Sequence, residues 1–180
     1  IYFALLGDVT ESNNEKEKID EEIISFGKEE VKRLNEKYKL QGFSRFHFLY
    51  RKRTWSDGEN KFIGWERKRG LISKFNKYIK NKINNDFLIN TIEEQKELLP
   101  NIKYIITLDS DTNLVLNSAS KLIGAMAHRL NIPVIENKRV VNGYSIMQPR
   151  IGLDLEIYKS SKFTEIYSIP GGIDFYSNSI

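Results

Sequence analysis

The 180 residues have the length of one ordinary domain, and 28 basic against 24 acidic side chains leave a net charge of +4. This mild positive charge is compatible with a nucleic acid, a phosphate-bearing small molecule or no charged partner. The absence of cysteine excludes disulfides and thiolate metal sites, and no apolar run is long enough to span a bilayer. We therefore expect residues 1–180 to form a single soluble domain.

Apolar runs and helical periodicities alternate along the chain. In chain order, the sequence predicts a strand at 2–8, a helix at 15–39, a strand at 45–51, a helix at 69–83, a strand at 104–108, a helix at 118–130 and a hairpin within 134–153. This alternation is typical of an α/β fold with a mainly parallel sheet flanked by helices. In such sheets, ligands bind at the carboxyl ends of the strands.

Local signals place the boundaries of these elements. Ser12 and Glu15 have the spacing of a capping box at the start of the first helix. Residues 53–62 read as a turn-rich excursion around Asp57 and Gly58. Asn142 and Gly143 predict the turn of the hairpin. Because the sequence opens on a strand already under way and closes without a helix, we expect a piece of a longer protein, incomplete at both ends.

Two acids one residue apart follow the apolar strand at 104–108. In an extended chain, residues i and i+2 point to the same side, so Asp109 and Asp111 would present both carboxylates to one place. Such like charges repel unless a cation lies between them, and Mg²⁺ or Mn²⁺ binds few carboxylates and completes its shell with water and phosphate. The pair predicts a divalent metal site, with a turn or helix cap as the alternative.

Three classes of protein carry a comparable acidic motif. A calcium-binding EF-hand loop is excluded, because Leu114 and Ser120 stand where it requires glycine and glutamate. A magnesium-dependent phosphatase of the haloacid dehalogenase type would use Asp109 as its nucleophile, but Asn113 replaces the threonine of that motif. The third class is the nucleotide-sugar glycosyltransferases, in which a metal bridges the two acids to a diphosphate.

A basic segment ahead of the helix at 69–83 favours the third class. Lys68 and Arg69 provide positive charge, and Gly70 allows close approach of the backbone to a diphosphate. The basic runs at 51–53 and 66–69, interleaved with aromatic residues, leave a nucleic-acid-binding module as an alternative. Such a module would not need Asp109 and Asp111.

Five blocks of the sequence resemble the glucosyltransferase region of cyclic beta-1,2-glucan synthases, which are large multidomain membrane proteins. The blocks are FALLGD, GWERKRGLISKFN, YIITLDSDT, LIGAMAHRLN and GYSIMQPR, in this order and across nearly the whole chain. More loosely, the order is similar to that of processive GT-A transferases such as cellulose synthases. The resemblance implies a GT-A (Rossmann-like) domain of a parent protein in the bacterial inner membrane, facing the cytoplasm.

The resemblance also implies an inverting transfer of glucose from UDP-glucose to a growing beta-1,2-glucan, with no nucleic acid as partner. Asp8 would contact the uracil or ribose, and Lys68, with Arg69–Gly70, would approach the diphosphate. Asp109 would hold the ribose or a metal-bound water, and Asp111 would ligate Mg²⁺ or Mn²⁺. The general base is not identified and is expected beyond residue 180, so the piece should bind donor without completing the transfer.

Other polar and aromatic residues have roles that the pattern leaves open. Trp65 is expected in the core, with stacking on a sugar or base as the alternative. Gln148 and Arg150 are candidate contacts to the sugar or acceptor. His47 and His128 are expected as ordinary strand and helix residues, because two histidines do not make a metal-ligand cluster.

Overall fold

The computed structural model describes residues 1–39 and 43–149, in two compact units, Ile1–Lys103 and Tyr104–Ile180. The first unit contains, in chain order, β1 (Phe3–Gly7), α1 (Lys18–Lys37), β2 (Phe46–Arg51), β3 (Thr54–Ser56), β4 (Lys61–Ile63), α2 (Arg67–Asn81), β5 (Phe87–Asn90) and the 3₁₀ segment η1 (Thr91–Asn101). The described part of the second unit contains α3 (Ser118–Ala127), β6 (Val134–Glu136) and β7 (Arg139–Asn142). The mixed α/β class is confirmed, whereas the GT-A arrangement and the single domain stay predictions.

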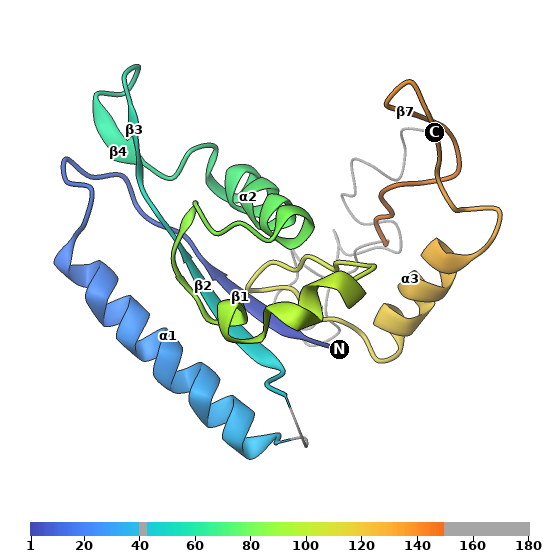
Figure 1. Cartoon of the computed structure of the whole chain (residues 1–180), viewed down its shortest axis with the longest axis horizontal. Helices are drawn as coiled ribbons and strands as arrows, with labels where there is room; N and C mark the ends of the chain where they lie inside the picture. Colours follow the sequence, from blue (N-terminus) through green and yellow to red (C-terminus); the bar gives the residue numbers. More distant parts are fainter. Residues whose placement is uncertain (40–42, 150–180) are drawn as a thin grey trace, which may run out of the picture. The chain divides into compact units, whose positions relative to one another are not determined.

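The central strand of the first unit is β2, which is covered on both faces. The sheet has the order β1-β2-β5, and α1 and α2 lie on opposite sides of it (Figure 1). Side chains of β2 alternate between the two faces: Leu49 packs in a cluster with residues of α2, and Phe48 and Tyr50 pack with Val31 of α1. This two-sided burial explains why the consecutive residues at 48–50 are all apolar.

The expected mainly parallel sheet is corrected by this structure. The pairing of β1 with β2 is parallel, but β5 pairs with β2 in the antiparallel direction. β5 is only four residues long and was not predicted, because an apolar run of that length carries too little periodicity to be recognised.

The start of α1 differs from the capping box expected at Ser12 and Glu15. The helix begins after Glu17, whose backbone N–H donates to Asp20 Oδ2 at 2.8 Å. Ser12 instead pairs through its backbone with Phe62 of β4, at 2.9 and 2.8 Å in the two directions. The turn-rich excursion that contains Asp57 and Gly58 is therefore a hairpin, β3–β4, tied to the loop before α1.

The hairpin of the second unit forms, but its turn lies elsewhere. Asn137 and Lys138, both with positive φ (49° and 64°), connect β6 and β7, which fits a two-residue hairpin turn. The predicted turn residue Gly143 also has a positive φ of 74°, and a Cβ there would lie 2.2 Å from the carbonyl oxygen of Ile132. Gly143 thus ends β7 instead of joining the two strands.

The strand expected at 104–108 is wrong. These residues form no strand in the described part of the second unit. Their four apolar residues, Tyr104, Ile105, Ile106 and Leu108, are 38–48% exposed. An apolar run becomes a strand only when a neighbouring strand satisfies its backbone groups. No pairing of this kind is recorded for residues 104–108 among the described strands.

Buried His47 gives the first unit a predicted pH dependence. Burial lowers the pKa of His47 below its ordinary value, so the unfolded chain binds this proton more readily than the folded chain. The free energy of unfolding should be fully retained above about pH 6.5 and should fall as the pH drops below that value. Urea unfolding between pH 5 and 8 measures this slope. It should flatten in His47→Gln and persist in the exposed control His128→Gln, and an unchanged slope in His47→Gln would contradict the assignment.

Candidate functional site

The carboxyl ends of β1 and β2 carry an acid and a base that meet. Asp8 follows β1, and the guanidinium of Arg51, at the end of β2, donates through Nε and Nη2 to its two carboxylate oxygens at 2.7 and 2.8 Å. The backbone N–H of Val9 donates to Asp8 Oδ1 at 2.8 Å. The Arg51 side chain is fully buried, whereas the Asp8 side chain keeps 31% of its surface exposed. Asp8 is therefore held firmly at the position expected of a ligand-binding strand end.

The same arginine reaches the turn that precedes α2. Arg51 Nη1 donates to the carbonyl oxygen of Trp65 at 2.8 Å. A Cβ on Gly64 would lie 2.3 Å from Arg51 Nη2 and 2.8 Å from Asp8 Oδ1, and a Cβ on Gly70 would lie 1.8 Å from the Trp65 oxygen. Gly70 was expected to admit a diphosphate to the backbone. In the structure its missing side chain is required by a contact within the chain.

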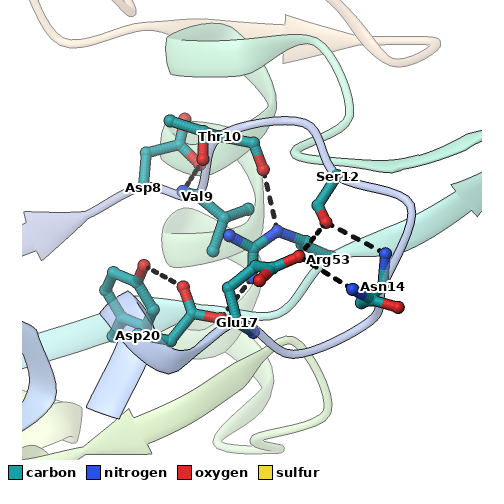
Figure 2. Close-up of polar contacts among 9 residues, drawn as sticks. Asp8, Val9, Thr10, Ser12, Asn14, Glu17, Asp20 and Arg53 are labelled. Carbon is teal, nitrogen blue, oxygen red and sulfur yellow. Dashed lines mark hydrogen bonds and ion pairs between the residues drawn. The ribbon is translucent and has the colours of Figure 1, made fainter. Parts of the chain in front are cut away.

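A second buried arginine anchors the loop between β1 and α1. Figure 2 shows Arg53 with this loop curving around it; its guanidinium donates to the carbonyl oxygen of Thr10 at 2.8 Å and forms an ion pair with Asp20. The hydroxyl of Tyr50 donates to the other oxygen of Asp20 at 2.7 Å. Burial and the Asp20 carboxylate raise the pKa of Tyr50, so it stays a neutral hydrogen-bond donor.

The predicted diphosphate residues lie on the first turn of α2. Lys68 and Arg69 are exposed there, and Arg69 forms an ion pair with the Glu66 carboxylate. Trp65 was expected in the core, but 49% of its surface is exposed. The core expectation is wrong because the backbone of Trp65, through its carbonyl, faces the buried Arg51. Its exposed ring leaves the alternative, a stacking role, available.

Asp109 and Asp111 belong to the second unit and are both exposed. The backbone N–H of Thr112 donates to the Asp109 carbonyl at 3.1 Å, so the two acids lie in a turn. The argument that an extended chain brings their carboxylates to one side does not apply to a turn. Carboxylate oxygens nevertheless suit Mg²⁺ or Mn²⁺, which take one or two of them and fill the shell with water and phosphate, so this donor pair fits such an ion.

The remaining candidates are distributed as follows. Gln148 is exposed in the second unit, and Arg150 lies outside the described residues. His128 directly follows α3, and its Nδ1 accepts a long hydrogen bond of 3.4 Å from the Leu130 N–H. Within the described residues, no group of three or more histidine, cysteine or acidic side chains is placed to hold a metal. Any cation at Asp109 and Asp111 would therefore take further ligands from outside that pair.

Comparison with known proteins connects this geometry to a family. No known protein-family model matches the chain. Over 180 residues, however, it is 36% identical to the cyclic beta-(1,2)-glucan synthase NdvB of Rhizobium meliloti (strain 1021). The chain is homologous to a segment of a cyclic beta-1,2-glucan synthase. The match covers 98% of this chain and 6% of that synthase, and it confirms the resemblance shown by the five sequence blocks.

Sequence reasoning missed the two arginines that organise this synthase-like segment. The basic run at 51–53 suggested a nucleic-acid contact, but Arg51 and Arg53 are both buried in ion pairs. A basic residue on either side of Lys52 at a strand end, with an acid at the end of the preceding strand, could have indicated internal pairing. Because buried guanidinium groups cannot reach phosphates, the nucleic-acid alternative loses much of its support.

The described residues also bear on the membrane. None of the helices among residues 1–39 and 43–149 has both the length and the apolar character needed to cross a bilayer.

Proposed function

We propose that this chain is the donor-binding side of a glycosyltransferase that transfers glucose from UDP-glucose to a growing beta-1,2-glucan. The proposal is carried by the homology to a protein named as a cyclic beta-(1,2)-glucan synthase. A beta linkage made from an alpha-linked donor such as UDP-glucose requires inversion at the anomeric carbon, so the transfer is inverting. By resemblance, the parent protein lies in the bacterial inner membrane with this part facing the cytoplasm.

The first unit supplies the proposed nucleoside and diphosphate contacts. Asp8 stands at the carboxyl end of β1, where its exposed edge can accept hydrogen bonds from a ribose hydroxyl or the uracil ring. Lys68 and Arg69, on the first turn of α2, provide positive charge for the diphosphate. The α2 backbone dipole adds to this attraction at the same helix end.

The second unit supplies the proposed metal ligands. Asp111 would ligate Mg²⁺ or Mn²⁺ directly, and Asp109 would hold the ribose or a metal-bound water. When bound, such an ion would offset the negative charge that develops on the departing UDP. Trp65, Gln148 and Arg150 are the candidate sugar or acceptor contacts. We assign no general base within the chain and therefore expect donor binding without completed transfer.

Calorimetric titration of nucleotides into the 180-residue chain tests this proposal. With Mn²⁺ present, UDP and UDP-glucose are expected to bind at least tenfold more tightly than ADP and GDP, because Asp8 is proposed to read the uridine. Equal binding of all nucleotides would contradict a uridine site. Hydrolysis of p-nitrophenyl phosphate that depends on Asp109 would favour the phosphatase alternative instead.

A further inference from the structure

Arg51 joins two segments that carry proposed donor contacts. All three of its nitrogen groups have partners: Nε and Nη2 bind the Asp8 carboxylate, and Nη1 binds the carbonyl oxygen of Trp65. The side chain is completely buried, so water cannot take the place of a lost partner. One rigid guanidinium thus connects the end of β1 to the turn that leads into Lys68 and Arg69.

The turn that Arg51 holds is conformationally strained. Glu66 and Arg67 both have left-handed backbones, with φ of 50° and 43°, although neither is glycine. A left-handed backbone is sterically disfavoured for a residue with a Cβ and persists only where surrounding contacts hold it. Those contacts include a hydrogen bond of 2.9 Å from the Arg67 N–H to the Gly64 carbonyl, and that from Arg51 to the Trp65 carbonyl.

The space around the Arg51 guanidinium is also restricted. Gly64 leaves room for it, because a Cβ at this position would overlap both Arg51 Nη2 and Asp8 Oδ1. Lysine could not replace this arrangement, since a single ammonium group cannot bind a carboxylate through two parallel hydrogen bonds and also reach a carbonyl on the far side. The pairing therefore needs arginine at position 51 and glycine at position 64.

We infer that Arg51 is a positioning residue, which sets Asp8 and residues 64–69 at the separation that a nucleoside diphosphate requires. Residues 64–69 comprise the turn before α2 and the first residues of that helix, and are called the 64–69 turn below. Arg51 acts through these groups without touching the ligand. The inference rests on the proposed function for its ligand, but the mechanical link between the two segments is independent of it.

Hydrogen–deuterium exchange on the full chain tests the mechanical link. In Arg51→Lys, amides of the 64–69 turn and of Val9 should exchange faster than in the unaltered chain. The matched control is Arg53→Lys, which removes an equally buried guanidinium that pairs with Asp20 and Thr10 instead. In Arg53→Lys, faster amide exchange should be confined to residues 10–20. Unchanged exchange of the 64–69 turn in Arg51→Lys would overturn the inference.

Titration of UDP with Mn²⁺ on the same proteins tests the consequence for binding. Arg51→Lys should raise the Kd about tenfold, comparable with the loss of orienting partners behind ligand-holding groups. Arg53→Lys should keep the Kd within about twofold of the unaltered chain, although both variants lose a buried guanidinium. An equal loss of affinity in both variants would mean that Arg51 is only structural, and would overturn the positioning role.

Two further outcomes separate this inference from the proposed function. If the unaltered chain binds no UDP while exchange changes as expected, the uridine site is contradicted and the Arg51 link stands alone. If Arg51→Lys does not fold, Gly64→Ala perturbs the same contact by crowding it while keeping the guanidinium, and Gly58→Ala is its control because a Cβ at Gly58 meets nothing within 4 Å. Exchange of the 64–69 turn should rise in Gly64→Ala only, and an equal rise in both would contradict the link.

Discussion

Asp20→Ala is expected to lower the free energy of unfolding by about 3–4 kcal/mol, because it leaves the buried Arg53 guanidinium without its partner. Asp20 and Arg53 are 2% and 3% exposed, and the carboxylate also accepts a hydrogen bond from Tyr50. The substitution thus leaves both the Arg53 guanidinium and the Tyr50 hydroxyl without the carboxylate that they bind. Urea unfolding followed by circular dichroism measures the loss.

The control for this prediction is Glu30→Ala on the same helix. Glu30 and Arg33 form an exposed ion pair, so its removal should cost less than about 1 kcal/mol. Equal losses in the two variants would contradict the assignment of a buried network.

The pH dependence of the Asp20 network follows from its hydrogen bonds. Burial acts to raise the pKa of Asp20, but hydrogen bonds from Arg53, the Glu17 backbone and Tyr50 outweigh it and hold the pKa below its ordinary value. The stabilisation is therefore complete above about pH 4 and is lost as the pH falls through the folded-state pKa. Asp20→Asn should reduce this acid-induced loss.

Gly70→Ala is expected to destabilise the chain by about 2–3 kcal/mol, although alanine normally favours a helix. The added Cβ would lie 1.8 Å from the Trp65 carbonyl oxygen, a backbone atom that already accepts a hydrogen bond from Arg51. The turn before α2 would have to move, and the exposed indole of Trp65 would report this as a shift in fluorescence.

Gly124→Ala is the matched control, because Gly124 also lies in a helix, α3, and a Cβ there meets nothing within 4 Å. It should raise the free energy of unfolding by up to about 1 kcal/mol through helix propensity alone. A stable Gly70→Ala variant with unchanged Trp65 fluorescence would contradict the close packing of this turn.

The parts of the fold that the sequence predicted well are those with a regular pattern. The helical stripe around Leu71, Phe75 and Tyr78 predicted α2, and the apolar run from Phe46 predicted β2. In both elements the spacing of apolar residues follows the face that is buried, and this spacing can be read from a single sequence. The run at 104–108 shows the limit, because apolar character alone did not provide a strand partner.

The candidate site was predicted less completely, because its organisation depends on pairings between distant residues. Asp8 was selected from its position after β1, but its partner Arg51 lies 43 residues later, and the pairing becomes evident only when β1 and β2 are known to be neighbours. The close contact of Gly70 with the Trp65 carbonyl was likewise not predicted, and the donor-binding role assigned to Gly70 stays a prediction. The proposed roles of Lys68, Asp109 and Asp111 stay predictions.

The most direct test of the proposed donor site is a UDP titration with Mn²⁺ and then with EDTA, on the unaltered chain, Asp111→Ala and Asn113→Ala. Asn113 is an exposed neighbour to which no metal role is assigned, so its variant controls for disturbance of this segment. The account predicts metal-dependent UDP binding in the unaltered chain and in Asn113→Ala, and its loss in Asp111→Ala. Binding that is unaffected by EDTA, or that persists in Asp111→Ala, would contradict it.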